Sequence, residues 1–178
     1  ELHRAYGDRI RFVVVNVREA HPGQDLPQPS TIEAKTHHAE RLRCHHRLDF
    51  EVAVDDVDGG LHRAFGTRPS SAYLIDPEGV IRFRAHWSNL TGELDDALAA
   101  LTAGKLPAKP FVGGTFRAML KLMGHASTAF SAAGRGAMAD TWRAVPPMAF
   151  MLTVTNLFRF VSRDRRGVAT LATLAGLP

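Results

Sequence analysis

The chain has 178 residues, of which 45% are hydrophobic and 22% charged, a composition typical of a soluble globular protein rather than a disordered one. Its single cysteine, Cys44, excludes an intrachain disulfide, so nothing in the sequence requires an oxidising compartment. The net charge of +4 is uneven: residues 1–104 carry −4 and residues 105–178 carry +8, which indicates two parts with different surroundings.

The chain begins at Glu1, in a segment typical of the end of a helix. We expect processing or truncation to have removed what precedes this segment, so a signal peptide cannot be judged from the sequence. We expect the protein to be cytoplasmic or membrane-peripheral, because its composition gives no reason for export.

Residues 12–17 form an almost unbroken apolar run, which predicts a strand buried on both faces. Ser30 and Glu33 have the spacing of a capping box and predict the start of a helix that extends to about Leu48. Residues 50–56 then predict a second strand. This order predicts a parallel strand–helix–strand unit.

A short helical turn at 58–66 leads into a predicted hairpin, whose strands cover 72–76 and 80–85. The sequence Asp76-Pro77-Glu78-Gly79 between these strands has Pro at the second position and Gly at the fourth, which suits a type I turn.

A helix over 91–103 is predicted from Thr91 as its N-cap, acidic residues in its first turn and Gly104 at its end. Together these elements predict an α/β fold in which the four strands form one mixed sheet, with the helices at 30–48 and 91–103 packed on it. The order is similar to a thioredoxin-like fold that lacks its first strand and the helix bearing the nucleophile.

Glycine and proline residues interrupt the chain near 102–110 and predict a domain boundary. We therefore expect a thioredoxin-like domain over 1–104 and a basic helical C-terminal extension over 105–178. In the extension, apolar residues near helical spacing predict a helix around 116–130, and a further helix ends where Pro146 and Pro147 follow.

The 14 residues from Met148 to Val161 are mostly apolar but fall short of the ~18–20 residues needed to span a bilayer. The helices of the extension either pack on the rest of the chain and on each other, which we prefer, or contact an anionic membrane surface or a partner protein. Nucleic-acid binding is not predicted, because the basic residues are scattered and no recognition motif accompanies them. The oligomeric state is left open.

Two segments resemble the iodothyronine deiodinase-like proteins, a family of the redoxins. The first has a V-D-x-x-D pattern, an aromatic-glycine pair, a proline and an aromatic residue at the family's spacing, carried here by Val54, Asp55, Asp58, Phe65, Gly66, Pro69 and Tyr73. The second is Glu19-Ala20-His21, which resembles the Glu-Ala-His loop of that family and precedes Pro22.

The resemblance implies a thiol- or selenol-dependent oxidoreductase that acts on a small-molecule substrate with a thiol reductant and needs no cofactor. It implies that His21 and Glu19 are catalytic, with His21 as proton donor or acceptor, and that Pro69 and Arg68 contact the substrate. We expect the nucleophilic cysteine or selenocysteine to lie upstream of residue 1. The chain as given is expected to be inactive, because Cys44 lies in the predicted helix and not where the family keeps its nucleophile.

Simpler interpretations stand beside these. His21 would bond a backbone carbonyl at the end of a strand, and Glu19 would be an orienting or solvated acid. A non-catalytic module that binds a partner or a membrane through its basic helices is the alternative function.

Four polar residues of the predicted helix at 30–48 share one face, namely His37, Arg41, Cys44 and His45. We interpret them as a solvated helix face and predict no metal site, because no carboxylate or second cysteine completes a ligand spacing. Asp55 and Asp58 are expected to bond turn amides.

Overall fold

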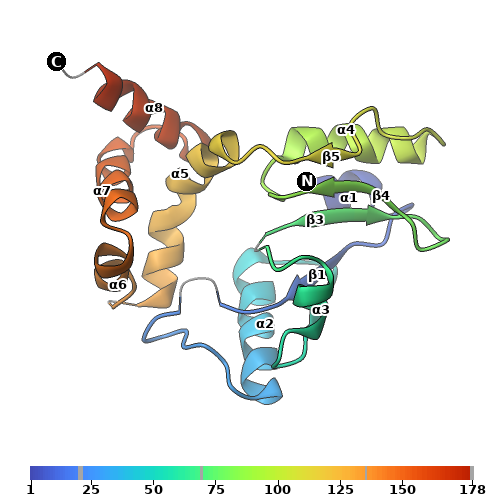
Figure 1. Ribbon diagram of the computed structural model, residues 1–178, viewed down its shortest axis with the longest axis horizontal. Coiled ribbons are helices and arrows are strands. Elements are labelled where there is room, and N and C mark those ends of the chain that lie inside the picture. The colour runs from blue at the N-terminus through green and yellow to red at the C-terminus, as the bar shows by residue number, and fades with distance from the viewer. Residues whose placement is uncertain (20–21, 69, 135, 177–178) are drawn as a thin grey trace. The chain divides into compact units, whose positions relative to one another are not determined.

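The computed structural model describes residues 1–19, 22–68, 70–134 and 136–176 (Figure 1). The chain divides into two compact units, unit 1 with residues 1–19 and 28–113, and unit 2 with residues 20–27 and 114–178. Unit 1 is mixed α/β, whereas the described elements of unit 2 are helical.

The elements of unit 1 are α1 (Leu2–Tyr6), β1 (Val13–Asn16), α2 (Ile32–His46), β2 (Glu51–Val54), α3 (Gly60–Ala64), β3 (Ala72–Ile75), β4 (Ile81–Ala85), α4 (Thr91–Thr102) and β5 (Phe111–Val112). Those of unit 2 are α5 (Phe116–Ala133), α6 (Gly136–Ala144), α7 (Pro146–Thr155), the 3-10 helix η1 (Asn156–Phe158) and α8 (Arg163–Ala175).

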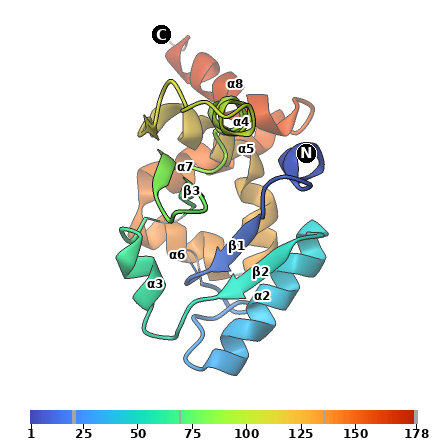
Figure 2. The same cartoon turned by 90° about the vertical axis from the view of Figure 1, so that its right-hand side faces the viewer.

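Strands β1 and β2 run parallel, with Val13 opposite Glu51 and Asn16 opposite Val54, and α2 packs against β2 (Figure 2). The parallel unit predicted from the sequence is therefore confirmed. The expected burial on both faces is wrong, because Val13 keeps 42% of its surface exposed and the other residues of β1 are only partly buried.

The prediction of one mixed sheet is also wrong, because within the described residues the strands form two sheets, β1–β2 and β3–β4–β5. β3 and β4 are the predicted antiparallel hairpin, and the amide of Gly79 donates to the carbonyl of Asp76 across its turn. The second edge of β4 pairs with β5, a short parallel strand that the sequence did not predict. A strand's apolar pattern specifies which face is buried, but it does not specify the neighbour.

The core of the second sheet follows the alternation of side chains along β4. Phe83 and Ala85 point to one face and are buried against Ala97 of α4. The side chains of Arg82 and Arg84 alternate with them and belong to the opposite face, and His86 directly follows the strand. Helix α4 therefore covers one face of β3–β4–β5.

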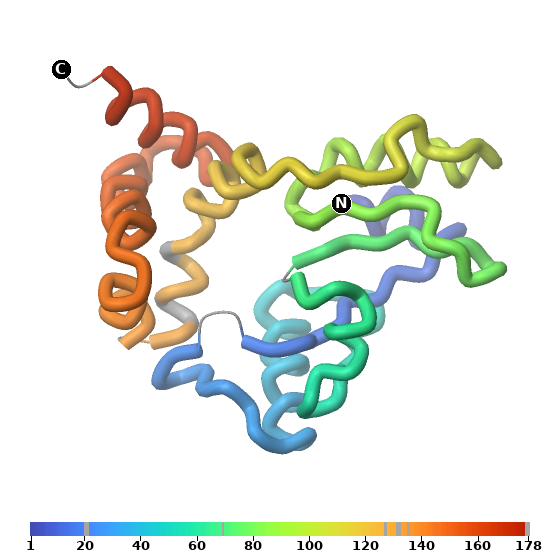
Figure 3. The backbone as a smooth tube through the Cα atoms, in the orientation of Figure 1, coloured from blue at the N-terminus to red at the C-terminus, as the bar shows by residue number. Residues whose placement is uncertain are grey.

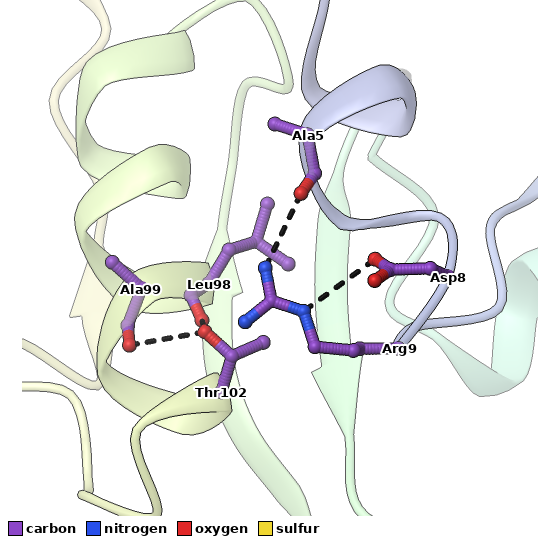
Figure 4. Close-up of polar contacts among 6 residues, drawn as sticks. All are labelled: Ala5, Asp8, Arg9, Leu98, Ala99 and Thr102. Atoms are coloured by element: carbon purple, nitrogen blue, oxygen red, sulfur yellow. Dashed lines mark hydrogen bonds and ion pairs between the residues drawn. The ribbon is translucent and has the colours of Figure 1, made fainter.

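The short helix α1 is joined to α4 by the hydroxyl of Tyr6, which donates to Asp95 at 2.7 Å. Figure 4 shows Arg9 donating to the carbonyl of Ala5, at the end of α1, and Thr102 of α4 donating to carbonyls of its own helix.

Two helix caps differ from the predictions. Thr31, not Ser30, caps α2, and its hydroxyl accepts from the amide of Ala34; the extended backbone required of a cap suits the β-branched threonine. Thr91 lies inside α4, whose N-cap is Leu90 without a side-chain bond. Leu90 is buried at this cap position, with 3% of its surface exposed.

Unit 2 is held together by small residues where α5 and α8 pack closely; the path of these helices can be followed in Figure 3. A Cβ added to Gly124 would lie 1.7 Å from the carbonyl oxygen of Arg163, and one added to Gly167 would lie 2.0 Å from that of Leu120. The buried hydroxyl of Thr170 donates to Thr155 at 3.0 Å and so links α8 to α7. The backbones approach to a distance that only glycine allows.

We predict that Gly124→Ala and Gly167→Ala each lower the free energy of unfolding by about 1–3 kcal/mol, because the added methyl group has to push the two helices apart. The measurement is urea denaturation followed by circular dichroism. Gly92→Ala is the control: no atom lies within 4 Å of its added Cβ, so this variant is expected to be neutral or slightly more stable. Equal stability of all three variants would contradict the close packing of α5 and α8.

Candidate functional site

The candidate site lies at the carboxyl edge of β1 and β2, where the two parallel strands end side by side. Glu19 follows β1, Asp55 follows β2, and the amide of Asp55 donates to the carbonyl of Asn16. The carboxyl ends of parallel strands are where ligands collect in α/β proteins. Helix α2 presents Lys35 and His38 to the interior of this unit, where their side chains are 2% and 8% exposed.

The centre of the site is a hydrogen-bonding contact between Glu19 and His38. The Nδ1 atom of His38 lies 3.0 Å from Oε1 of Glu19, and the carboxylate is itself only 24% exposed. A carboxylate in this position accepts from Nδ1–H, which fixes the orientation of the ring and leaves Nε2 as the nitrogen that can exchange a proton. An imidazole held by an acid is the arrangement that general acid–base catalysis uses.

Asp55 is 4% exposed and accepts hydrogen bonds from the backbone amides of Asp56, Leu61 and His62 at 2.9–3.0 Å. Burial raises the pKa of Asp55, but the amide hydrogen bonds and the charge of Lys35 outweigh burial, so the pKa lies below its usual value. Its carboxylate oxygens are thus occupied by the start of α3, and its role is to hold that turn.

Lys35 of α2 contacts the residue that follows Asp55. Its Nζ donates to the carbonyl of Asp56 at 2.6 Å, which ties α2 to the end of β2. A lysine buried to this degree needs such partners, because an unpaired ammonium inside a protein is costly. Lys35 therefore positions the helix that carries His38.

Two further polar atoms of this region have spare bonding capacity. Oδ1 of Asn16 and Nε2 of His62 are buried and have no hydrogen-bond partner in the part of the chain that the structure describes. Buried polar atoms are nearly always bonded, so each is a position where a bound polar group would be stabilised.

Of the residues predicted from the sequence, Glu19 lies at the end of β1 as expected, while Arg68 is exposed in the loop before β3. His21 and Pro69 lie outside the described residues, so their predicted proximity stays a prediction. Cys44 is exposed on α2. The prediction that Asp55 and Asp58 bond turn amides is confirmed for Asp55. Among the described residues of this segment the second carboxylate to do so is that of Asp56, not Asp58: it accepts from the amide of Gly60.

His38 was missed. The helix face predicted from the sequence carries His37, Arg41, Cys44 and His45, which are exposed, whereas His38 lies on the opposite face. The signal was present: Lys35, His38, Ala39 and Leu42 have the i, i+3, i+4, i+7 spacing of an inward helix face. Among the described residues, no group of three or more His, Cys, Asp or Glu side chains is placed to hold a metal ion.

A hollow of about 410 Å³ lies at the opposite end of the parallel pair, beside the starts of β1 and β2. Its charged residues already have partners: Arg11 bonds Glu51, and Arg9 bonds Asp8. His3 lies 2.9 Å from Asp49. This end of the sheet therefore offers less free bonding capacity than the carboxyl edge.

We predict that Asp55→Asn lowers the free energy of unfolding at pH 7 by about 2–3 kcal/mol, because an amide accepts the three backbone bonds less well than a carboxylate. The folded-state pKa of Asp55 lies below its unfolded value of 3.8, so its stabilisation is present above pH 3.8 and is lost as the pH falls through the folded pKa. Denaturant unfolding of both proteins between pH 2 and 7 measures this difference.

The exposed Asp58→Asn in the same loop is the control and is expected to change little at any pH. A difference between Asp55→Asn and the parent that did not shrink at low pH would contradict the assigned hydrogen bonds.

Comparison with known proteins adds no relative: no family model, no curated protein and no solved structure matches this chain.

Proposed function

We propose that unit 1 belongs to a thiol- or selenol-dependent oxidoreductase of deiodinase-like, thioredoxin-like type, in which Glu19 and His38 form the proton-transfer pair. The observation that carries this proposal is the 3.0 Å contact between Nδ1 of the buried His38 and the carboxylate of Glu19. Glu19 belongs to the loop that resembles the Glu-Ala-His loop of the deiodinase-like proteins.

The order of the elements in unit 1 and a contact within the second resembling segment support the thioredoxin-like fold in this proposal. A parallel β1–α2–β2 unit is followed by the antiparallel hairpin β3–β4 and by α4, which is the element order of the later part of a thioredoxin-like domain. Phe65 and Tyr73, two residues of the second resembling segment, are in contact: their rings are 4.8 Å apart, and the Tyr73 hydroxyl donates to the carbonyl of Phe65.

The chemistry follows from the free nitrogen of His38. Nε2 takes the proton of a thiol or selenol and so forms the nucleophilic anion, while Glu19 stabilises the imidazolium through Nδ1–H. With a hydroperoxide, the anion attacks the terminal oxygen and the O–O bond breaks. The departing alkoxide then takes the proton back from Nε2, which leaves an oxidised sulfur or selenium and an alcohol.

The nucleophile in this proposal is not Cys44, which is exposed on α2. A thiol or selenol upstream of residue 1 supplies it, and a small thiol reductant regenerates it. The same protonated imidazole would serve a reductive dehalogenation, in which carbon gains the proton as the halogen passes to the nucleophile.

We predict that the 178-residue chain lacks thiol peroxidase and reductive dehalogenase activity, and that the gene product with the upstream nucleophile has one of them. In that protein His38→Gln is expected to lower kcat by about 10²–10⁴-fold through loss of general acid–base catalysis. His37→Gln is the matched control, because it removes the adjacent, exposed histidine of α2 and should leave kcat unchanged.

The pH profile gives a second readout: His38→Gln should flatten the limb that reports proton uptake by the imidazole, while circular dichroism matches the parent. His21→Ala, measured in parallel, assigns the proton donor to one histidine or the other. Full activity of His38→Gln would refute the proposed pair. If the 178-residue chain showed turnover and Cys44→Ser abolished it, the nucleophile would be Cys44 on α2.

A specific observation in unit 2 favours a second candidate function, binding to an anionic membrane surface. The connection between α7 and α8 is held by Arg166, which donates to the carbonyls of Val161 and Arg159 at 2.9 Å. It leaves Leu157 and Phe160 73% and 85% exposed.

The exposed arginines Arg159, Arg163 and Arg165 accompany these apolar side chains, and within the described ranges none of the three has an acidic partner. Apolar side chains flanked by basic ones are typical of segments that enter the headgroup region of anionic lipid. In the part of the chain that the structure describes, no helix combines the length and apolarity that crossing a bilayer requires.

We predict that the chain co-floats with vesicles that contain phosphatidylglycerol and not with pure phosphatidylcholine vesicles, and that salt weakens the binding. Leu157→Ser and Phe160→Ser together should weaken it by at least about tenfold, because both side chains lose their burial in lipid. Leu106→Ser and Phe116→Ser, at equally apolar positions that are 69% and 68% exposed, are the controls. Equal loss in both pairs, or no binding, would exclude this surface.

A further inference from the structure

One face of β4 carries basic side chains that the proposed proton transfer does not use. Arg82 and Arg84 alternate along β4 with the inward-pointing Phe83 and Ala85, and His86 directly follows the strand. Arg82 has a partner, because its Nε bonds the carboxylate of Asp76. Across the described residues, neither Arg84 nor His86 has an acidic partner.

The loop before β3 carries a further basic residue, Arg68. The amide of Ser88 donates to the carbonyl of Ser70 at 2.6 Å, which joins the loop to the segment after β4. A Cβ added to Gly66 would lie 3.3 Å from Nη2 of Arg84, so the loop passes close to that guanidinium. Arg68 belongs to the same loop and is exposed.

Burial lowers the pKa of His86, and the charges of Arg68 and then Arg84 lower it further. Both arginines are therefore close enough to His86 for their charges to act on it. Both effects favour the neutral form of the imidazole.

Aromatic rings hold Arg84 in place. Its Cζ lies 5.7 Å from the ring centre of Tyr73 and 6.0 Å from that of Phe111, and Phe111 also contacts His86 edge-on at 4.8 Å. Stacking restricts the guanidinium, which lowers the entropy lost when the fork binds a ligand. Nε of Arg84 is buried and has no partner among the described residues, so one of its N–H groups has an unused bond.

We infer that Arg68, Arg84 and His86 form a binding site for an oxyanion, the carboxylate or phosphate group of a small molecule. Two guanidinium groups that act on one imidazole, with no carboxylate paired to either among the described residues, are balanced by an oxyanion that accepts charge-assisted hydrogen bonds from them. His86 gains a proton when the anion neutralises the arginines, and it then becomes a third donor.

This site goes beyond the proposed proton transfer and does not require it. It is measured by binding in the absence of turnover, so its failure leaves the pair of Glu19 and His38 untouched. Failure of the activity assay likewise leaves the oxyanion site standing.

The test is an NMR titration of the histidine ring protons in the 178-residue chain, with the His86 signal assigned from His86→Gln. Sodium sulfate serves as the probe, because it has the tetrahedral oxygens of a phosphate and does not titrate near neutral pH; sodium acetate is the carboxylate probe. Sodium chloride keeps the ionic strength constant. We expect saturable binding of at least one probe, with a rise of about 1 in the pKa of His86 at saturation.

Arg84→Gln and Arg68→Gln should each weaken that binding by about tenfold or more, and Arg84→Lys should weaken it despite keeping the charge, because the planar fork is lost. Arg43→Gln is the matched control: it removes one arginine of unit 1 that is paired with Glu40 on α2, and binding should stay as in the parent. Amide spectra confirm that each variant is folded.

The tighter of the two probes identifies the group that the site takes. No saturable shift with either probe overturns the inference. Unchanged binding in both Arg84→Gln and Arg68→Gln also overturns it, because the anion would then be held elsewhere and the arginines would be only a stacked surface.

Discussion

The parallel register of β1 and β2 is the constraint on which the carboxyl-edge site of unit 1 depends. With Asn16 opposite Val54, both strands end at one edge, so Glu19 and Asp55 leave the sheet together. Helix α2 connects the two strands and packs against β2, and Lys35 and His38 on its inward face lie near the two acids. A shift of the register by one residue would reverse the faces of a strand and separate these groups.

Local periodicity accounts for what the sequence predicted correctly. The parallel unit, the hairpin with its Asp76–Gly79 turn and the helix before Gly104 each follow from short apolar patterns and turn residues. The division of the strands between two sheets could not be predicted from these local patterns. It depends on which distant strand pairs with each strand edge. The pairing of β4 with β5 involves two residues, Phe111 and Val112, too few to produce a pattern.

The partner of Glu19 shows a different limit. Glu19 was identified from the loop in which it lies, whereas His38 is 19 positions away on a helix whose polar residues cover most of its surface. Helical spacing identifies the inward face, but a lysine and a histidine on that face contradict the usual rule that such faces are apolar. The conflict is resolved only in three dimensions, where the carbonyl of Asp56 and the carboxylate of Glu19 supply their partners. Polar residues on an inward helix face, against the usual pattern, are expected at functional sites.

Net charge is a poor guide to the ligand of such a domain. Residues 1–104 carry −4, yet their acids at the carboxyl edge are already engaged: Asp55 by three amides and Lys35, and Glu19 by His38. On β4 the situation is reversed, since Arg82 is balanced by Asp76 while Arg84 and Arg68 have no acid among the described residues. A domain that is acidic overall can therefore attract an anion at one place. The electric field at contact distance comes mainly from the nearest charged groups that lack a partner. More distant exposed charges contribute little, because salt screens them beyond about 8–10 Å. The sequence pattern that reports this is the alternation of basic and apolar residues along β4.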